Sequence, residues 1–250
     1  MPELVSDSDD LADDYNRSQK THVDHVNASL KGRTESQLYM ADCYLKGTIE
    51  KRDTKKAIEL LELLDKKGID EATRKLGDFF FIGGKNGSDK NLNLAVKYYE
   101  KLAKKGKDDA KLLMAECYLR GDGVKFPINI NKAKECVEDG ARKGNAKFQF
   151  LLGDILLKNE GGLKKNETEA VKWFTLAANQ KHVPAMSQLA ACFSSGKGVA
   201  KDVQQAKRYF QMVVDAKATD KTSENEAIYK EAANELAKLK SLNGLCFEAF

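Results

Sequence analysis

The feature that most constrains this chain is internal repetition. When the 250-residue sequence is aligned with itself at a shift of 36 to 38 positions, the same residue types recur at three positions. We call the three positions that the copies share landmarks. The first landmark is a small residue, Ala41, Gly77, Ala115, Gly153 and Ala190. Three residues later each copy has an aromatic or large apolar residue, Tyr44, Phe80, Tyr118, Leu156 and Phe193. The third shared position is an alanine that opens the next helical run, Ala57, Ala95, Ala133, Ala170 and Ala206.

Such a period predicts a solenoid, because a unit of this size buries its apolar face only against its neighbours. Each copy contains two helical segments joined by a glycine-containing turn, and the whole chain has only three prolines. Few prolines leave long helices uninterrupted. The sequence therefore predicts an all-α fold, an α-solenoid of five helix-turn-helix repeats in one elongated domain.

The two ends of the array are predicted to be caps. Gly32 lies nine residues before Ala41, as Gly68 lies nine before Gly77, so residues 15–33 form an N-terminal capping half-repeat. Residues 34–220 hold the five repeats, and the second helix of the first repeat has Asp53 as its N-cap candidate. Residues 221–250 form a C-terminal capping helix and tail, with the helix expected to stop at Asn243-Gly244. The final LCFEAF either folds back on the last repeat or is offered to a partner.

Charge is distributed unevenly along the chain. Residues 1–14 contain six Asp and Glu residues and no Lys or Arg. Removing those six charges from the net charge of +4 leaves +10 on residues 15–250. We interpret residues 1–14 as an acidic disordered tail, which either stays solvated, screens the basic body in cis or acts as an interaction arm.

The cysteines indicate a reducing compartment. There are five, with no CxxC pair, and Cys43, Cys117 and Cys192 occupy one equivalent repeat position. A cysteine recurring at one position is typical of a small packing residue, so we expect free thiols. No secretory signal and no apolar run of about 20 residues is visible, so an intracellular, cytoplasmic protein without membrane insertion is expected.

The combination of LGxxY, GxGVxxD and KAxxWYxxAAxxG resembles the Sel-one-like repeat (SLR) family of the tetratricopeptide superfamily. The motifs appear here as KLGDFFFIGG, MAECYLRGDGV, LLGDILL and QLAACFSSGKGVAKD, across about Thr34 to Lys217. The first repeat lacks the GxGV turn, and Lys181 and Lys217 replace the closing glycine. The resemblance implies a right-handed superhelix of antiparallel helix pairs that serves as an adaptor, with the first helices lining the concave face.

Catalytic and cofactor motifs are missing from the sequence. The glycine-rich turns lack the Gly-Lys-Ser/Thr ending of a phosphate-binding loop. His22, His25 and His182 are the only histidines. His22 and His25 share a helical face and would hold a metal ion only weakly, so we interpret them as exposed cap residues. We expect no enzyme activity, no cofactor and no metal site.

The candidate binding surface is an acidic column one residue after the small landmark, formed by Asp42, Asp78, Glu116 and Asp154. Apolar residues predicted on the same face are Leu38, Leu112 and Phe150. This pattern suits a protein or peptide partner with basic and apolar side chains. The alternative is ordinary surface and core, because Lys46, Arg120 and Lys158 follow three of the acids at helical i,i+4 spacing. Two further hypotheses are a nucleic-acid-associated protein using the basic body and a regulatory subunit of an enzyme.

Overall fold

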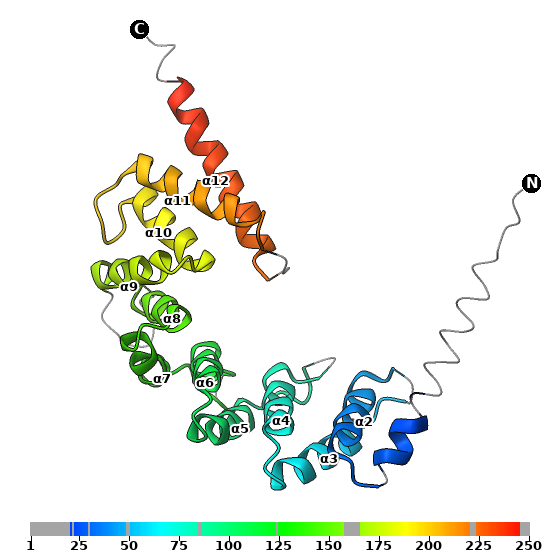
Figure 1. Ribbon diagram of the computed structural model, residues 1–250. Helices are drawn as coiled ribbons and strands as arrows, with labels where there is room; N and C mark the ends of the chain where they lie inside the picture. Colours follow the sequence, from blue (N-terminus) through cyan, green and yellow to red (C-terminus); the bar gives the residue numbers. More distant parts are fainter. Residues whose placement is uncertain are drawn as a thin grey trace, which may run out of the picture. The chain divides into compact units, whose positions relative to one another are not determined.

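The computed structural model describes residues 21, 23–29, 31–48, 51–84, 87–123, 125–157, 166–220 and 224–245 (Figure 1). Their regular structure is helical, with no strand among them. The helices are α2 (Thr34–Lys46), α3 (Thr54–Lys66), α4 (Asp70–Ile82), α5 (Leu92–Lys104), α6 (Asp108–Arg120), α7 (Ile130–Arg142), α8 (Ala146–Leu157), α9 (Glu167–Asn179), α10 (Val183–Ser195), α11 (Val203–Ala216) and α12 (Glu226–Leu245). The predicted all-α repeat architecture is confirmed.

The chain divides into two compact units, residues 1–110 and 111–250, with the boundary inside α6. In the first unit α2 packs on α3, α3 on α4, and α4 on α5. In the second unit each helix from α7 to α12 packs on the next in chain order, and Figure 1 shows α8, α9 and α10 side by side. Each unit has its own core cluster, one including Leu61 and Leu76 and the other Phe174 and Leu189. Packing between sequence neighbours is the pattern of a repeat array.

The small landmark residues let the two helices of a hairpin approach closely. All five are buried. A Cβ atom added to Gly77 would lie 2.5 Å from Cε1 of Tyr99, and one added to Gly153 would lie 2.7 Å from Cε1 of Phe174. Real Cβ atoms do not make such contacts, so the aromatic ring of the second helix occupies the space that glycine leaves open.

Each second helix begins with the same polar cap. The capping residues are Asp53, Asn91, Asn129, Asn166 and Asp202. Each side-chain oxygen accepts a hydrogen bond from a backbone N–H of the first turn, at 2.9 to 3.1 Å. These bonds satisfy N–H groups that have no partner within the helix. The prediction of Asp53 as an N-cap is confirmed.

The same five residues also close the turn between the two helices. Their backbone N–H groups donate to the carbonyl oxygens of the second landmark, Tyr44, Phe80, Tyr118, Leu156 and Phe193, at 2.8 to 3.1 Å. The connecting segments differ in length, from eight residues between Tyr44 and Asp53 to ten between Phe80 and Asn91. One hydrogen bond therefore fixes where the second helix starts, so the turn sequence is free to vary.

The repeats close on a residue with positive φ. This position holds Gly32, Gly68, Gly106 and Gly144, with φ between 78° and 91°. Lys181, at the equivalent position, keeps the left-handed conformation with φ of 61°. Lys217 does not, because its φ of −57° continues a right-handed turn. The two lysines that replace glycine in the sequence are therefore accommodated in different ways.

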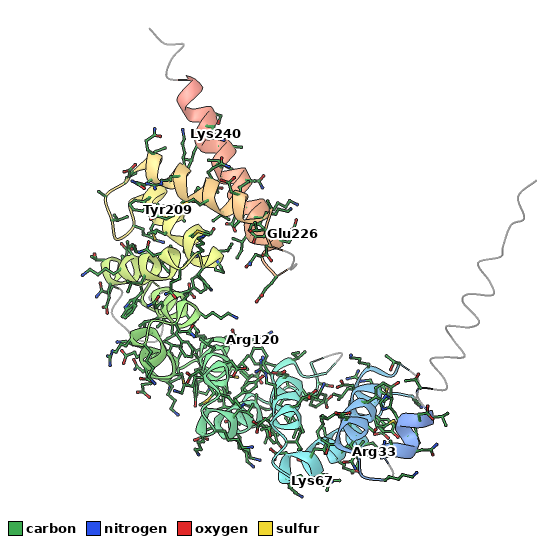
Figure 2. All side chains as sticks on the ribbon, in the orientation of Figure 1. Arg33, Lys67, Arg120, Tyr209, Glu226 and Lys240 are labelled. Atoms are coloured by element: carbon green, nitrogen blue, oxygen red, sulfur yellow. The ribbon has the colours of Figure 1, made fainter. Side chains whose placement is uncertain are left out.

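The two ends of the array carry additional helix. A helix over 21–29 precedes α2, and the His25 ring stacks on Tyr39 with centroids 4.1 Å apart. Residues 15–20 and 1–14 lie outside the described residues. At the other end, Tyr229, Ala232, Leu236 and Leu239 of α12 are buried against the second core. Glu226, at the start of α12 (Figure 2), pairs with Lys217 at 2.6 Å. The predicted stop at Asn243-Gly244 is wrong, since α12 continues to Leu245, and residues 246–250 lie outside the described part.

Candidate protein-binding surface

Asp42 on α2 forms a contact between repeats. Its carboxylate accepts two hydrogen bonds from Nζ of Lys75 on α4, at 2.8 and 2.9 Å. The Lys75 side chain is 25% exposed and that of Asp42 is 34% exposed. The predicted alternative paired Asp42 with Lys46 on its own helix, but the bonds that the structure shows cross to the next repeat. The Asp42 charge thus helps to hold α2 against α4.

Asp78 on α4 belongs to a small polar network. It accepts a hydrogen bond from the Tyr99 hydroxyl at 2.8 Å and one from Nε of Arg74 at 3.2 Å. Arg74 also pairs with Asp109 at the start of α6. The Asp78 side chain is still 43% exposed, so it retains surface to present to another molecule.

Leu38, the apolar residue predicted beside these acids, is only 8% exposed. It belongs to the core cluster of the first unit. Its side chain therefore packs in the core beneath the acidic column and offers little area to a partner.

The second unit contains the other two acidic positions. Glu116 on α6 is exposed and Asp154 on α8 is partly exposed. Leu112 and Phe150 are partly buried and pack against the core of this unit. Phe150 contacts the rings of Phe174 and His182, with centroids 6.0 and 5.2 Å away. Lys158, the predicted partner of Asp154, lies outside the described residues.

His182 is a partly buried histidine of the second unit. Burial lowers its pKa, and the nearby Lys147 charge lowers it further. Its Nδ1 atom is buried and has no hydrogen-bond partner among the residues that the structure describes. A neutral imidazole packed against Phe150 serves as a ring filling space between helices, so we assign it a packing role.

A hollow of about 470 Å³ lies in the first unit, beside the predicted column. Its apolar lining is Leu45 from α2 with Phe79 and Ile82 from α4. Its charged lining is Lys46, Arg52, Lys75 and Asp78. Ile82 is 63% exposed, so much of its side chain faces the solvent at the hollow. Sequence reasoning missed Arg52 and Ile82, because neither falls on a landmark of the repeat.

Thiol and metal chemistry have little support in this surface. Cys43, Cys117, Cys136 and Cys192 are free thiols, and Cys246 lies outside the described residues. Burial raises the pKa of Cys117 to about 12, with the Glu116 charge adding to the effect. A thiol with so high a pKa is a poor nucleophile. The described ranges contain no group of three His, Cys, Asp or Glu side chains able to hold a metal ion.

His25, which the sequence placed on one face with His22, has partners within the protein. Its Nδ1 atom lies 3.3 Å from the Ser36 hydroxyl, and its ring stacks on Tyr39. His22 lies outside the described residues. His25 is thus engaged in holding the first helix against α2.

Lysine side chains in both units are interleaved with acids. Lys101 pairs with Asp65 at 2.5 Å, Lys105 with Asp70 at 2.5 Å, and Lys143 with Asp139 at 2.7 Å. Such pairing breaks the positive potential that would attract a phosphate backbone. The geometry therefore does not favour nucleic-acid binding. No helix in the described ranges combines the length and the hydrophobicity needed to cross a membrane.

Comparison with known proteins gives a consistent result. The Sel1 repeat matches residues 34–64, 70–107, 108–145, 146–182 and 183–213. A protective antigen of uropathogenic Escherichia coli strains, which displays an SLR fold, is 27% identical over 76% of this chain and 40% of that chain, with a TM-score of 0.57. A Sel1 repeat protein from Oxalobacter formigenes is 22% identical over 79% of this chain and 56% of that chain, with a TM-score of 0.62.

The matched regions thus span less than two thirds of either of those two proteins. No curated protein sequence matches the chain. The five matched segments cover most of the chain and coincide with the helical hairpins of the structure. The chain belongs to the Sel1 repeat family.

Proposed function

We propose that this chain is a non-enzymatic scaffold that binds a partner protein or peptide through the exposed face of its first helices. Sel1 repeat proteins generally mediate protein–protein interaction and are generally not catalytic. The observation that carries the proposal for this chain is the hollow between α2 and α4. It combines apolar walls with a charged rim, and concave apolar surface with a few polar groups is what binding sites require.

The predicted contact residues contribute to this surface in different ways. Asp78, Glu116 and Asp154 keep exposed or partly exposed side chains, and we propose that they meet basic groups of the partner. Asp42 acts through Lys75, so it positions the surface more than it contacts the partner. Leu38, Leu112 and Phe150 supply the apolar support beneath those charges. We place the protein in the cytoplasm, in keeping with the free thiols of the described residues.

The test compares two charge reversals of equal size on different helices. Glu116→Lys changes an exposed residue of α6, a first helix, and Glu135→Lys changes an exposed residue of α7, a second helix. Affinity capture with the wild-type chain and with each variant, followed by mass spectrometry, identifies what each retains. We expect partner capture to survive Glu135→Lys and to fall with Glu116→Lys, while both variants keep the wild-type melting temperature within a few degrees. Equal capture by both variants would exclude α6 from the binding surface.

A further inference from the structure

The hollow between α2 and α4 carries more positive charge than the acidic column around it suggests. Lys46, Arg52 and Lys75 line it, against the single carboxylate of Asp78. Lys75 is engaged with Asp42 and Glu71, at 2.8 and 3.7 Å. The other two cations that line the hollow are Lys46 and Arg52.

Lys46 and Arg52 form no ion pair with any of the residues that the structure describes. Lys46 ends α2 and is exposed. Arg52 is partly buried, and its Nε atom is buried without a hydrogen-bond partner. Its guanidinium passes close to Gly84, where an added Cβ would lie 2.6 Å from Nη2 and 3.0 Å from an oxygen of Asp89. A buried donor without an acceptor is unfavourable, and a carboxylate arriving here would supply the missing acceptor.

Beside these cations the hollow exposes an apolar surface. Leu45, Phe79 and Ile82 form it, and Ile82 is the most exposed of the large apolar side chains in the described residues. The fitting occupant is thus a segment in which an apolar side chain lies among carboxylates. Basic groups of a partner would meet Lys46 and Arg52 here, so this part of the surface suits acidic groups and leaves Asp78 to the basic ones.

The chain itself contains such a segment. Residues 1–14 combine Leu4, Val5 and Leu11 with six Asp and Glu residues and no Lys or Arg. The helix over 21–29 packs on α2 through His25 and Tyr39, and α2 forms one wall of the hollow. Residues 15–20, fully extended, span about 20 Å. The 13 residues of α2 are also about 20 Å long. The acidic segment is therefore tethered within reach of either end of α2.

We propose that residues 1–14 bind in the hollow between α2 and α4 of the same chain, with an apolar side chain against Ile82 and carboxylates on Arg52 and Lys46. The segment covers Asp78, one edge of the surface that we assign to a partner. It thus acts as an intramolecular competitor that a partner has to displace. The binding of residues 1–14 stands without the proposed function, because it concerns two parts of one chain, whereas the role of competitor rests on that function.

The first experiment uses the full chain with labelled isoleucine methyl groups. In a second full chain, the six acids of residues 1–14 are changed to Asn or Gln. We expect the NMR signal of the Ile82 methyl group to differ between the two chains, because the occupant has left. The signal of Ile155, buried in the second unit, should not change. The difference should be the same over a tenfold range of protein concentration, since the contact lies within one molecule.

The second experiment adds a synthetic peptide of residues 1–14 to the neutralised chain and follows the Ile82 signal. Tethered segments reach effective concentrations in the millimolar range, so even a dissociation constant of about 1 mM supports binding in cis. We expect Lys46→Glu in the neutralised chain to weaken peptide binding by about tenfold or more. The matched control is Lys67→Glu, at the exposed end of α3 outside the hollow (Figure 2), which should change it little.

Three results would overturn the proposal. One is an Ile82 signal that is the same in the wild-type and neutralised chains. Another is equal weakening of peptide binding by Lys46→Glu and Lys67→Glu, which shows attraction to positive charge in general. The third is an Ile82 difference that grows with protein concentration, which places the acidic segment on a second copy. Failure of partner capture in the test above would leave all of these measurements unaffected.

Discussion

At the scale of single residues, four of the five hairpins match a small landmark residue to the size of the side chain that faces it. The two repeats with glycine at the landmark face an aromatic residue on the second helix, Tyr99 or Phe174. Leu61 and Val137 are the equivalent residues in two repeats with alanine, and Phe210 in the third is aromatic against Ala190. The landmarks themselves were predictable, because they repeat. The aromatic ring that requires each glycine was not predictable, because the alignment does not show which side chain fills the space between the two helices of a hairpin.

The charged residues illustrate the same limit. The acidic column is visible in the sequence, and a helical i,i+4 partner was the only partner that spacing could suggest. The structure instead gives Asp42 a partner 33 residues away, Lys75, and gives Asp78 the hydroxyl of Tyr99. Neither partner recurs in every repeat, so no periodic signal marks it. Arg52 and Ile82 of the hollow also lie off the periodic positions.

At the closing position of the repeats, replacing a lysine with glycine should change the free energy of unfolding in opposite directions at Lys181 and Lys217. Lys181 has a φ of 61°, which costs a residue with a Cβ about 1 to 2 kcal/mol. Glycine avoids that strain but loses about 0.5 to 1 kcal/mol through its freer unfolded state. Lys181→Gly should therefore raise the free energy of unfolding by up to about 1 kcal/mol.

Lys217→Gly is the control, because the φ of Lys217 is −57° and there is no strain to relieve. This change should lower the free energy of unfolding by about 0.5 to 1 kcal/mol through the backbone. Loss of the exposed Lys217–Glu226 ion pair adds to that decrease, by up to about 1 kcal/mol. Urea denaturation of the three proteins measures both effects. Destabilisation by Lys181→Gly equal to that by Lys217→Gly would show that the left-handed conformation at Lys181 is not strained.

At the scale of helices, the start of each second helix is specified more tightly than the turn before it. Asp or Asn occurs four residues before every third-landmark alanine, as Asn129 does before Ala133. This column was available in the sequence, but only Asp53 was identified from it. Its double role, with a capping side chain and a backbone N–H that closes the turn, required the structure.

The cap column predicts the effect of a single side chain. Asn129→Ala removes the acceptor for the Lys132 N–H, now bonded at 2.9 Å, and leaves the backbone bond to Tyr118 in place. We expect the free energy of unfolding to fall by about 0.5 to 2 kcal/mol. Asn129→Asp keeps an acceptor and should recover most of that loss. Thermal and urea unfolding of the two variants make the comparison, and equal loss in both would mean that Asn129 acts through another contact.

At the scale of the whole molecule, the repeat period was sufficient to predict the all-α array, its five repeats and its family. The helices of the structure and the five Sel1 repeat matches both follow it. The division into two compact units was not predicted. Every repeat has the same landmarks, so the sequence shows no division at Ala110. The extra length of α12 was also missed, since Asn-Gly is a frequent helix stop and here lies within the last turn.

The central claim is that a partner protein meets the first helices of this array. Its most direct test places a photo-crosslinking amino acid at position 116 on α6 and, in a separate chain, at position 135 on α7. Both sites are exposed, so both side chains tolerate replacement. The account predicts a specific crosslinked partner from position 116 and none from position 135. Crosslinking from position 135 alone, or the same partner at equal yield from both positions, would contradict it.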